Sequence, residues 1–148
     1  MITIGQAAPL FEAGSTQGTI KLKDYLGKQP VVLIFYPKDE TPICTKQLCA
    51  VRDSKAQYDK HQAIVLGVNP GSLEEHQRFA QKNRYDFPLV TDTDGKIRDA
   101  FEVGKPFISL LGLQGRVVIV IGKSGNIIYA SKGNRPTAEI LKAIEQES

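Results

Sequence analysis

The chain has 148 residues, of which 41% are hydrophobic and 24% are charged. These fractions are close to those of ordinary soluble proteins, so they disfavour a disordered chain, a collagen-like repeat and a disulfide-rich secreted scaffold. The formal net charge is +3 and the basic residues are scattered among acidic ones, so we expect no nucleic-acid partner. The length suits a single domain over residues 1–148.

The first six residues lack a basic segment followed by an apolar one, so nothing indicates export and we expect a cytoplasmic protein. The longest apolar run, Val117 to Ile121, is far shorter than the ~18 residues typical of a membrane span, so we expect no membrane partner. In a reducing compartment the cysteine pair Cys44 and Cys49 indicates catalysis, redox sensing or metal binding more than a structural bridge.

The first half of the chain predicts a small hairpin followed by a βαβ unit. Residues 1–29 carry turn signals and are expected to form the hairpin and a linker. Residues 30–36 and 63–68 are continuous apolar runs, typical of strands buried on both faces, and the stretch between them has helical spacing. The two strands should therefore be parallel.

The second half predicts an alternation of helices and strands. Ser72 and Glu75 form a capping box that opens a helix to about Arg84, and Pro136 begins a last helix. Between them we expect a short strand, a brief helix ending at Phe101, an irregular segment and a β-hairpin, over residues 87–90, 94–101, 104–115 and 117–130. The element order predicts an α/β fold with a mixed sheet and helices on both sides.

Cys44 lies where a buried strand passes into a helix. Thr41 is a good N-cap residue and Pro42 suits the first helical position, so Cys44 falls in the first turn, where backbone N–H groups are free. Such a place can lower a thiol pKa from ~8.5 into the range of ~3.5–7.5 and so favours the thiolate. The alternative is a small buried apolar residue at a helix start, which is common for free cysteine.

Cys49 follows five residues later, about 500° round the helix, so the two side chains should point about 140° apart. Their α-carbons would be ~8 Å or more apart, whereas a disulfide needs them within ~7 Å. A bridge between Cys44 and Cys49 would therefore require the first helical turns to unwind. The alternative for Cys49 is a thiol packed in the helix core.

The pattern Phe-Tyr-Pro-Lys-Asp-x-Thr-Pro-x-Cys-Thr-x-x-x-Cys resembles the active-site segment of the peroxiredoxins, in the peroxiredoxin Q or bacterioferritin comigratory protein branch. The likeness extends over nearly the whole chain, with further matches at residues 5–11, at His76-x-x-Phe79-x-x-Lys82 and at Gly115-Arg116. It implies a thioredoxin-like fold, a three-layer α/β/α arrangement with a mixed central sheet and an N-terminal β-hairpin extension. It also implies a thiol-dependent peroxidase.

Carried over to matching positions, the resemblance makes Cys44 the peroxidatic cysteine and Cys49 the resolving one, with Pro37, Thr41 and Arg116 completing the peroxide pocket. Attack of sulfur on one peroxide oxygen moves negative charge onto the other, so fixed donors stabilise the transition state. Arg116 would supply a permanently charged fork of donors, and Pro37 would shield the thiolate from water. Taken alone, Arg116 would be a surface arginine and Thr41 a helix cap.

Neighbouring polar residues have no expected role in this chemistry. Lys38 and Asp39 are expected to be solvated loop charges, and His76 to be a packed or partly exposed histidine. The sequence departs from the family pattern in four places: Ile43 stands where the branch usually has Gly, and Gln47 where it often has Glu. Val117-Val118 follow Arg116 where Ser/Thr-Thr is usual, and Gly122 replaces the usual Asp. These departures leave the reaction type in place and leave the preferred peroxide open.

The resemblance implies reduction of hydrogen peroxide and organic hydroperoxides, with a disulfide recycled by thioredoxin or a similar dithiol. We expect a monomer that needs no metal, haem or flavin. The first alternative is a redox-switched binding or chaperone protein that uses the same two cysteines without turnover. A general thiol–disulfide oxidoreductase would carry Cys-x-x-Cys, and the spacing of the cysteines and histidines does not fit a zinc site.

Overall fold

The computed structural model describes residues 2–39, 42–103 and 116–147, and for residues 42–45 it describes the backbone. Its strands are β1 (Glu12–Ala13), β2 (Ile20–Lys21), β3 (Val31–Phe35), β4 (Ile64–Asn69), β5 (Leu89–Thr91), β6 (Val117–Ile121) and β7 (Ile127–Lys132). Its helices are η1 (Leu22–Asp24, a 3-10 turn), α1 (Pro42–Asp53), α2 (Lys55–Lys60), α3 (Leu73–Asn83), α4 (Lys96–Ala100) and α5 (Thr137–Glu147). The expected irregular segment 104–115 lies outside the described residues.

The main sheet has the strand order β5-β4-β3-β6-β7, with β3 at its centre. β3 is parallel to β4, as the sequence predicts, and antiparallel to β6. β6 and β7 form the predicted hairpin. The sheet is therefore mixed, and the carboxyl ends of β3 and β4 lie at the same edge as the start of β6.

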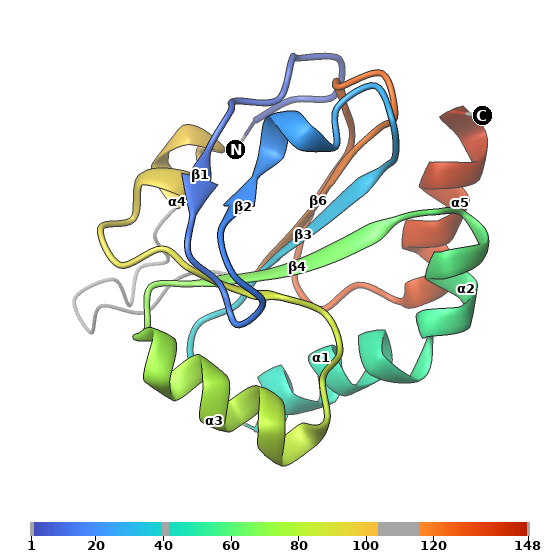
Figure 1. Ribbon diagram of the computed structural model, residues 1–148. Coiled ribbons are helices and arrows are strands. Elements are labelled where there is room, and N and C mark those ends of the chain that lie inside the picture. The colour runs from blue at the N-terminus through green and yellow to red at the C-terminus, as the bar shows by residue number, and fades with distance from the viewer. Residues whose placement is uncertain (1, 40–41, 104–115, 148) are drawn as a thin grey trace.

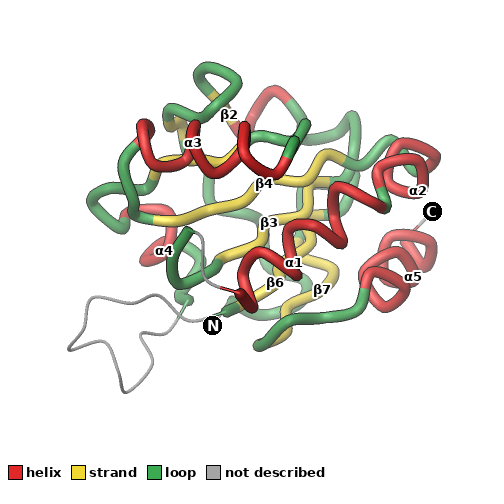
Figure 2. The backbone as a smooth tube through the Cα atoms, turned by 90° about the horizontal axis from the view of Figure 1, so that it is seen from below, coloured by secondary structure: helices red, strands yellow, loops and turns green. Residues whose placement is uncertain are grey.

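Helices and the N-terminal segment cover opposite faces of this sheet (Figure 1). Alternate residues of β3 contribute to two separate cores, because successive strand side chains point to opposite faces. One core joins the sheet to α1, α2, α3 and α5, and α1 crosses in front of the strands in Figure 2. The other joins it to the N-terminal segment and α4. The predicted mixed α/β architecture is confirmed.

The N-terminal extension is a hairpin of β1 and β2, as predicted, and it also closes one edge of the main sheet. The Thr16 N–H donates to the Leu89 carbonyl at 3.1 Å, and the Thr91 N–H donates to the Gly14 carbonyl at 2.9 Å. Ser15 and Val90 form a β-bridge between these two bonds. The edge of β5 is thereby covered by the chain itself.

The helical elements largely follow the sequence signals. Ser72 and Glu75 form the reciprocal capping box predicted for α3, which ends at Arg84 in a left-handed conformation. The helical stretch after β3 differs from the prediction, because it divides into α1 and α2 at Ser54. Ser54 has φ −102° and ψ 13°, outside the helical range, which separates the two helices. In the described part of the chain, no helix is long and apolar enough to cross a membrane.

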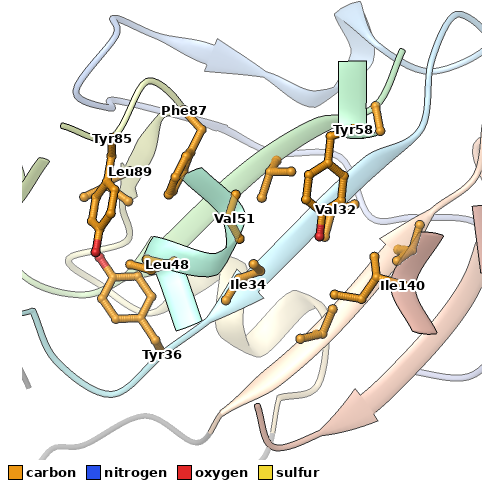
Figure 3. Packing of buried hydrophobic residues seen from close by; sticks show 14 of the residues in the cluster. Val32, Ile34, Tyr36, Leu48, Val51, Tyr58, Tyr85, Phe87, Leu89 and Ile140 are labelled. Atoms are coloured by element: carbon orange, nitrogen blue, oxygen red, sulfur yellow. The ribbon is translucent and has the colours of Figure 1, made fainter. Parts of the chain in front are cut away.

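Aromatic packing joins α3 to the sheet. Phe79 is 0% exposed and its ring lies between those of Tyr36 and Tyr85, with centroid distances of 6.4 and 5.3 Å. Figure 3 shows the neighbouring part of the same core, where Leu48 and Val51 of α1 pack over β3. The core therefore fixes both α1 and α3 relative to the carboxyl end of β3.

Replacing Phe79 with Ala should lower the free energy of unfolding by about 3–5 kcal/mol, because it leaves a cavity at the α3–sheet contact. Urea denaturation followed by circular dichroism would measure this loss. Leu73→Ala in the same helix is the control, since Leu73 is 38% exposed and its truncation should cost less than about 1 kcal/mol. Equal losses in the two variants would contradict the packing argument.

Candidate active site

The candidate site lies at the edge where β3 and β4 end and β6 begins. The loop after β3 contains Pro37 and leads into α1, and Pro37 is half-buried. The antiparallel register pairs Phe35 with Val117, so Arg116 lies at this same edge. Arg116 is half-buried, and its carbonyl accepts from the Gly133 N–H at 2.9 Å. The fold therefore brings Pro37 and Arg116 to the start of α1.

Cys44 is in the first turn of α1, which begins at Pro42 as the sequence predicts. The backbone N–H groups of this turn have no carbonyl partner within the helix and attract negative charge. The side chain of Cys44 and the whole of Thr41 lie outside the described residues. Their expected roles remain predictions.

Cys49 is a free thiol, half-buried against the core shared by α1 and α3. Its Sγ lies 3.4 Å from the hydroxyl oxygen of Tyr85, which follows α3. Burial, together with the hydrogen bond with Cys49, raises the pKa of the Tyr85 phenol well above its usual value. Tyr85 therefore stays protonated and can keep contact with the cysteine sulfur throughout the physiological pH range.

Arg52 makes a second connection between the same two elements. Its Nη1 donates to the Asn83 carbonyl at 2.7 Å, and the Asn83 side chain donates to the Phe79 carbonyl at 3.0 Å. Arg52 is three residues after Cys49, so both side chains lie on one face of α1. This face of α1 is thus held at two points against the end of α3.

Asp39 is buried, with 8% of its surface exposed, so its prediction as a solvated loop charge is wrong. One carboxylate oxygen accepts from the Tyr36 hydroxyl at 2.6 Å, and the other lies 2.6 Å from Nδ1 of His76. The prediction of a packed His76 is confirmed, since that side chain is 0% exposed. The hydrogen-bonding partners explain the burial, because a carboxylate leaves water only when it is paired.

Gln47 is also buried, at 4% exposure. Neither its amide oxygen nor its amide nitrogen has a hydrogen-bond partner in the part of the chain that the structure describes. Residues three apart share a helix face, so Gln47 lies on the Cys44 side of α1. Gln47, which stands where the family branch often has Glu, is therefore a buried side chain rather than a surface one.

The contacts of Tyr85, Tyr36 and Asn83 were not predicted from the sequence. The three-residue spacing of Cys49 and Arg52 could have shown that these two share a helix face. Tyr85 carries no comparable local signal, because its contact with Cys49 spans 36 residues of chain. Among the described residues, no group of three or more His, Cys, Asp or Glu side chains is arranged to hold a metal ion.

A mixed five-stranded sheet, with a cysteine in the first turn of the helix after its central strand, defines a thioredoxin-like thiol protein. Comparison with known proteins identifies the family within this class. Residues 4–130 match the AhpC/TSA family, and the chain belongs to it. Membership of this peroxiredoxin family supports thiol-peroxidase activity.

Two relatives show the branch within that family. The chain is 40% identical over 152 residues to peroxiredoxin Bcp from Bacillus subtilis, covering 97% of this chain and 94% of that protein. It is 43% identical over 128 residues to chloroplastic peroxiredoxin Q from Populus jackii, covering 84% of this chain and 59% of that protein. The resemblance to the peroxiredoxin Q and Bcp branch is confirmed.

Solved structures agree with this assignment. A peroxiredoxin Q mutant from Xylella fastidiosa superposes with a TM-score of 0.89 at 27% identity, covering 99% of this chain and 98% of that one. Peroxidoxin BcpB from Mycobacterium tuberculosis superposes with a TM-score of 0.88 at 26% identity, covering 100% and 99% of the two chains. The predicted thioredoxin-like fold is confirmed.

Tyr85→Phe should make Cys49 react several times faster with a thiol reagent, because the hydroxyl contact to sulfur is lost while the ring can still stack on Phe87. The measurement is the labelling rate of Cys49 in a Cys44→Ser background, followed by mass spectrometry. Tyr58→Phe is the matched control, since Tyr58 is a buried tyrosine in α2. An unchanged rate in Tyr85→Phe would show that the hydroxyl does not restrain Cys49.

Proposed function

We propose that this protein reduces hydrogen peroxide and organic hydroperoxides through the Cys44 thiolate. The sulfur attacks one peroxide oxygen, the O–O bond breaks, and the other oxygen leaves with a proton as water or alcohol. Cys44 is thereby oxidised to the sulfenic acid. The Cys49 thiol then attacks this sulfur, a disulfide forms, and the sulfenic oxygen leaves as water. An external dithiol such as thioredoxin reduces the disulfide and is itself oxidised.

The observation that carries this proposal is the register of β6 against β3. It brings Arg116 to the junction of β3 and α1, and Cys44 is in the first turn of that helix. A guanidinium and free backbone donors at one sheet edge suit a reaction in which negative charge develops on a departing oxygen. We assign Pro37 to shielding of the sulfur and the Thr41 hydroxyl to a further hydrogen bond with the peroxide.

The disulfide step requires a change in α1, because five residues of helix hold the two cysteines on different faces. Cys49 must also leave Tyr85, whose hydroxyl it contacts at 3.4 Å. Local unfolding of α1 accounts for both changes. The Cys44–Cys49 disulfide is therefore assigned to a catalytic state that differs from the reduced fold.

The relatives support the choice of substrate. The bacterioferritin comigratory protein of Xanthomonas campestris has alkyl peroxide reduction activity, and its solved structure superposes with a TM-score of 0.85 at 25% identity. We extend this substrate class to the present chain. We further propose that residues 1–148 act as a single monomeric domain in the cytoplasm.

Peroxide treatment followed by mass spectrometry tests the function directly. The reduced protein should form one Cys44–Cys49 disulfide within a chain, and turnover with thioredoxin should be lost in Cys44→Ser. Cys49→Ser should still consume one equivalent of peroxide and then stop, since its sulfenic acid has no resolving thiol. A single stoichiometric oxidation of the unmodified protein, without turnover under any dithiol, would refute the peroxidase assignment.

Arg116→Ala should slow oxidation of Cys44 by about 100-fold, as expected when one fixed donor to a developing anion is lost. Stopped-flow kinetics of the first oxidation would measure this effect. Arg78→Ala is the control, because Arg78 is an exposed arginine on α3 and should leave the rate unchanged. Parent-like kinetics in Arg116→Ala would remove this residue from the proposed pocket.

A further inference from the structure

A cluster of buried polar side chains next to the candidate site has no role in the chemistry described above. Asp39 belongs to the loop between β3 and α1, three residues before Pro42. Its carboxylate contacts Tyr36, which directly follows β3, and His76 of α3, each at 2.6 Å. Asn69, at the end of β4, donates from its side chain to the Tyr36 carbonyl at 2.8 Å. The loop after β3, helix α3 and the end of β4 therefore meet at this cluster.

The hydrogen bonds of His76 determine its protonation state. Nε2 lies 3.2 Å from the Asn69 carbonyl oxygen, which can only accept, so Nε2 carries a hydrogen. Nδ1 faces a carboxylate oxygen of Asp39, whose other oxygen accepts from Tyr36. Because both ring nitrogens face acceptors, the imidazolium form of His76 can donate a hydrogen bond from each of them. The carboxylate form of Asp39 can accept both of its hydrogen bonds. The pair is then buried as two opposite charges with no net charge.

The surroundings are built closely around this pair. At Gly71 an added Cβ would lie 2.9 Å from Oδ1 of Asn69 and 3.2 Å from Cε1 of His76, so a side chain there would collide with the cluster. The Gly71 N–H also donates to Oδ1 of Asn69 at 2.7 Å. The close approach of this backbone keeps both Asn69 and His76 in place.

We propose that the His76 imidazolium and the Asp39 carboxylate act as positioning residues for the loop between β3 and α1, which leads to Cys44. This inference rests on the proposed function. Asp39 is five residues before Cys44, and its side chain is fixed by Tyr36, directly after β3, and by His76 of α3. The loop therefore leaves the sheet from a fixed point, ahead of the helix that carries Cys44. Displacement of a reacting group by about 1 Å can cost 100-fold in rate, so this anchoring matters for Cys44.

The protonation state can be tested without any enzymatic assay. ¹⁵N NMR of the reduced protein at neutral pH should show both ring nitrogens of His76 protonated. In Asp39→Asn this signature should be lost, because the amide cannot pair with an imidazolium as a carboxylate does. A neutral His76 with one protonated nitrogen in the parent would overturn the charged pair.

Kinetics test the positioning role. Asp39→Asn and His76→Gln should each slow the first oxidation of Cys44 by about 10- to 100-fold. The double variant should be no slower than the slower single variant, since its two neutral amides can bond to each other. The matched control is Asp92→Asn, which alters a buried carboxylate that accepts from the Ile97 and Arg98 N–H groups of α4. Its oxidation rate should equal that of the parent.

The outcomes separate this inference from the proposed function. If the unmodified protein does not oxidise Cys44 with peroxide, the proposed function fails, and the NMR result still decides the charged pair. If the parent is oxidised but the Asp39 and His76 variants react at the parent rate, the positioning role is refuted. A loss of thermal stability with unchanged oxidation kinetics would show that the pair only stabilises the fold.

Discussion

Burial of β3 on both faces is the constraint on which the rest of the structure depends. Each of its five residues, Val31 to Phe35, is at most 1% exposed, and alternate side chains pack into the two cores. Such a strand tolerates little change of register, since a shift by one residue would exchange its two sets of side chains. The position of its carboxyl end is therefore fixed. The loop to α1 leaves from this end, and β6 begins beside it.

The loop between β3 and α1, and α1 itself, are attached to the rest of the fold by contacts of different length. The pair of Asp39 and His76 holds the loop before α1 through short bonds between buried groups. Further along the helix, Cys49 is held by a longer contact to the Tyr85 hydroxyl at 3.4 Å. Phe79 packs between Tyr36 and Tyr85, so the two attachments share one aromatic core. The shorter contact precedes both cysteines in the chain, and the longer one lies on α1, at Cys49.

Local signals predicted most of the fold but only part of the site. The capping box at Ser72, the apolar runs and the Thr-Pro helix start all act through near neighbours, so α3, β3, β4 and α1 could be predicted. The burial of Asp39 could not, because its partner His76 lies 37 residues away and only the folded chain brings them together. The contact of Cys49 with Tyr85 escaped prediction for the same reason.

The N-terminal cover of β5 also restricts self-association. A strand at a sheet edge offers unpaired backbone groups to any other chain, and this is a common route to aggregation. Residues 14–16 already occupy the outer side of β5 through two backbone hydrogen bonds and a β-bridge. Because β5 pairs with residues 67–69 of β4, this cover protects the part of the sheet edge that β5 forms. The chain thus keeps the outer side of β5 paired with its own residues, so that this strand offers no unpaired backbone to a neighbouring molecule there.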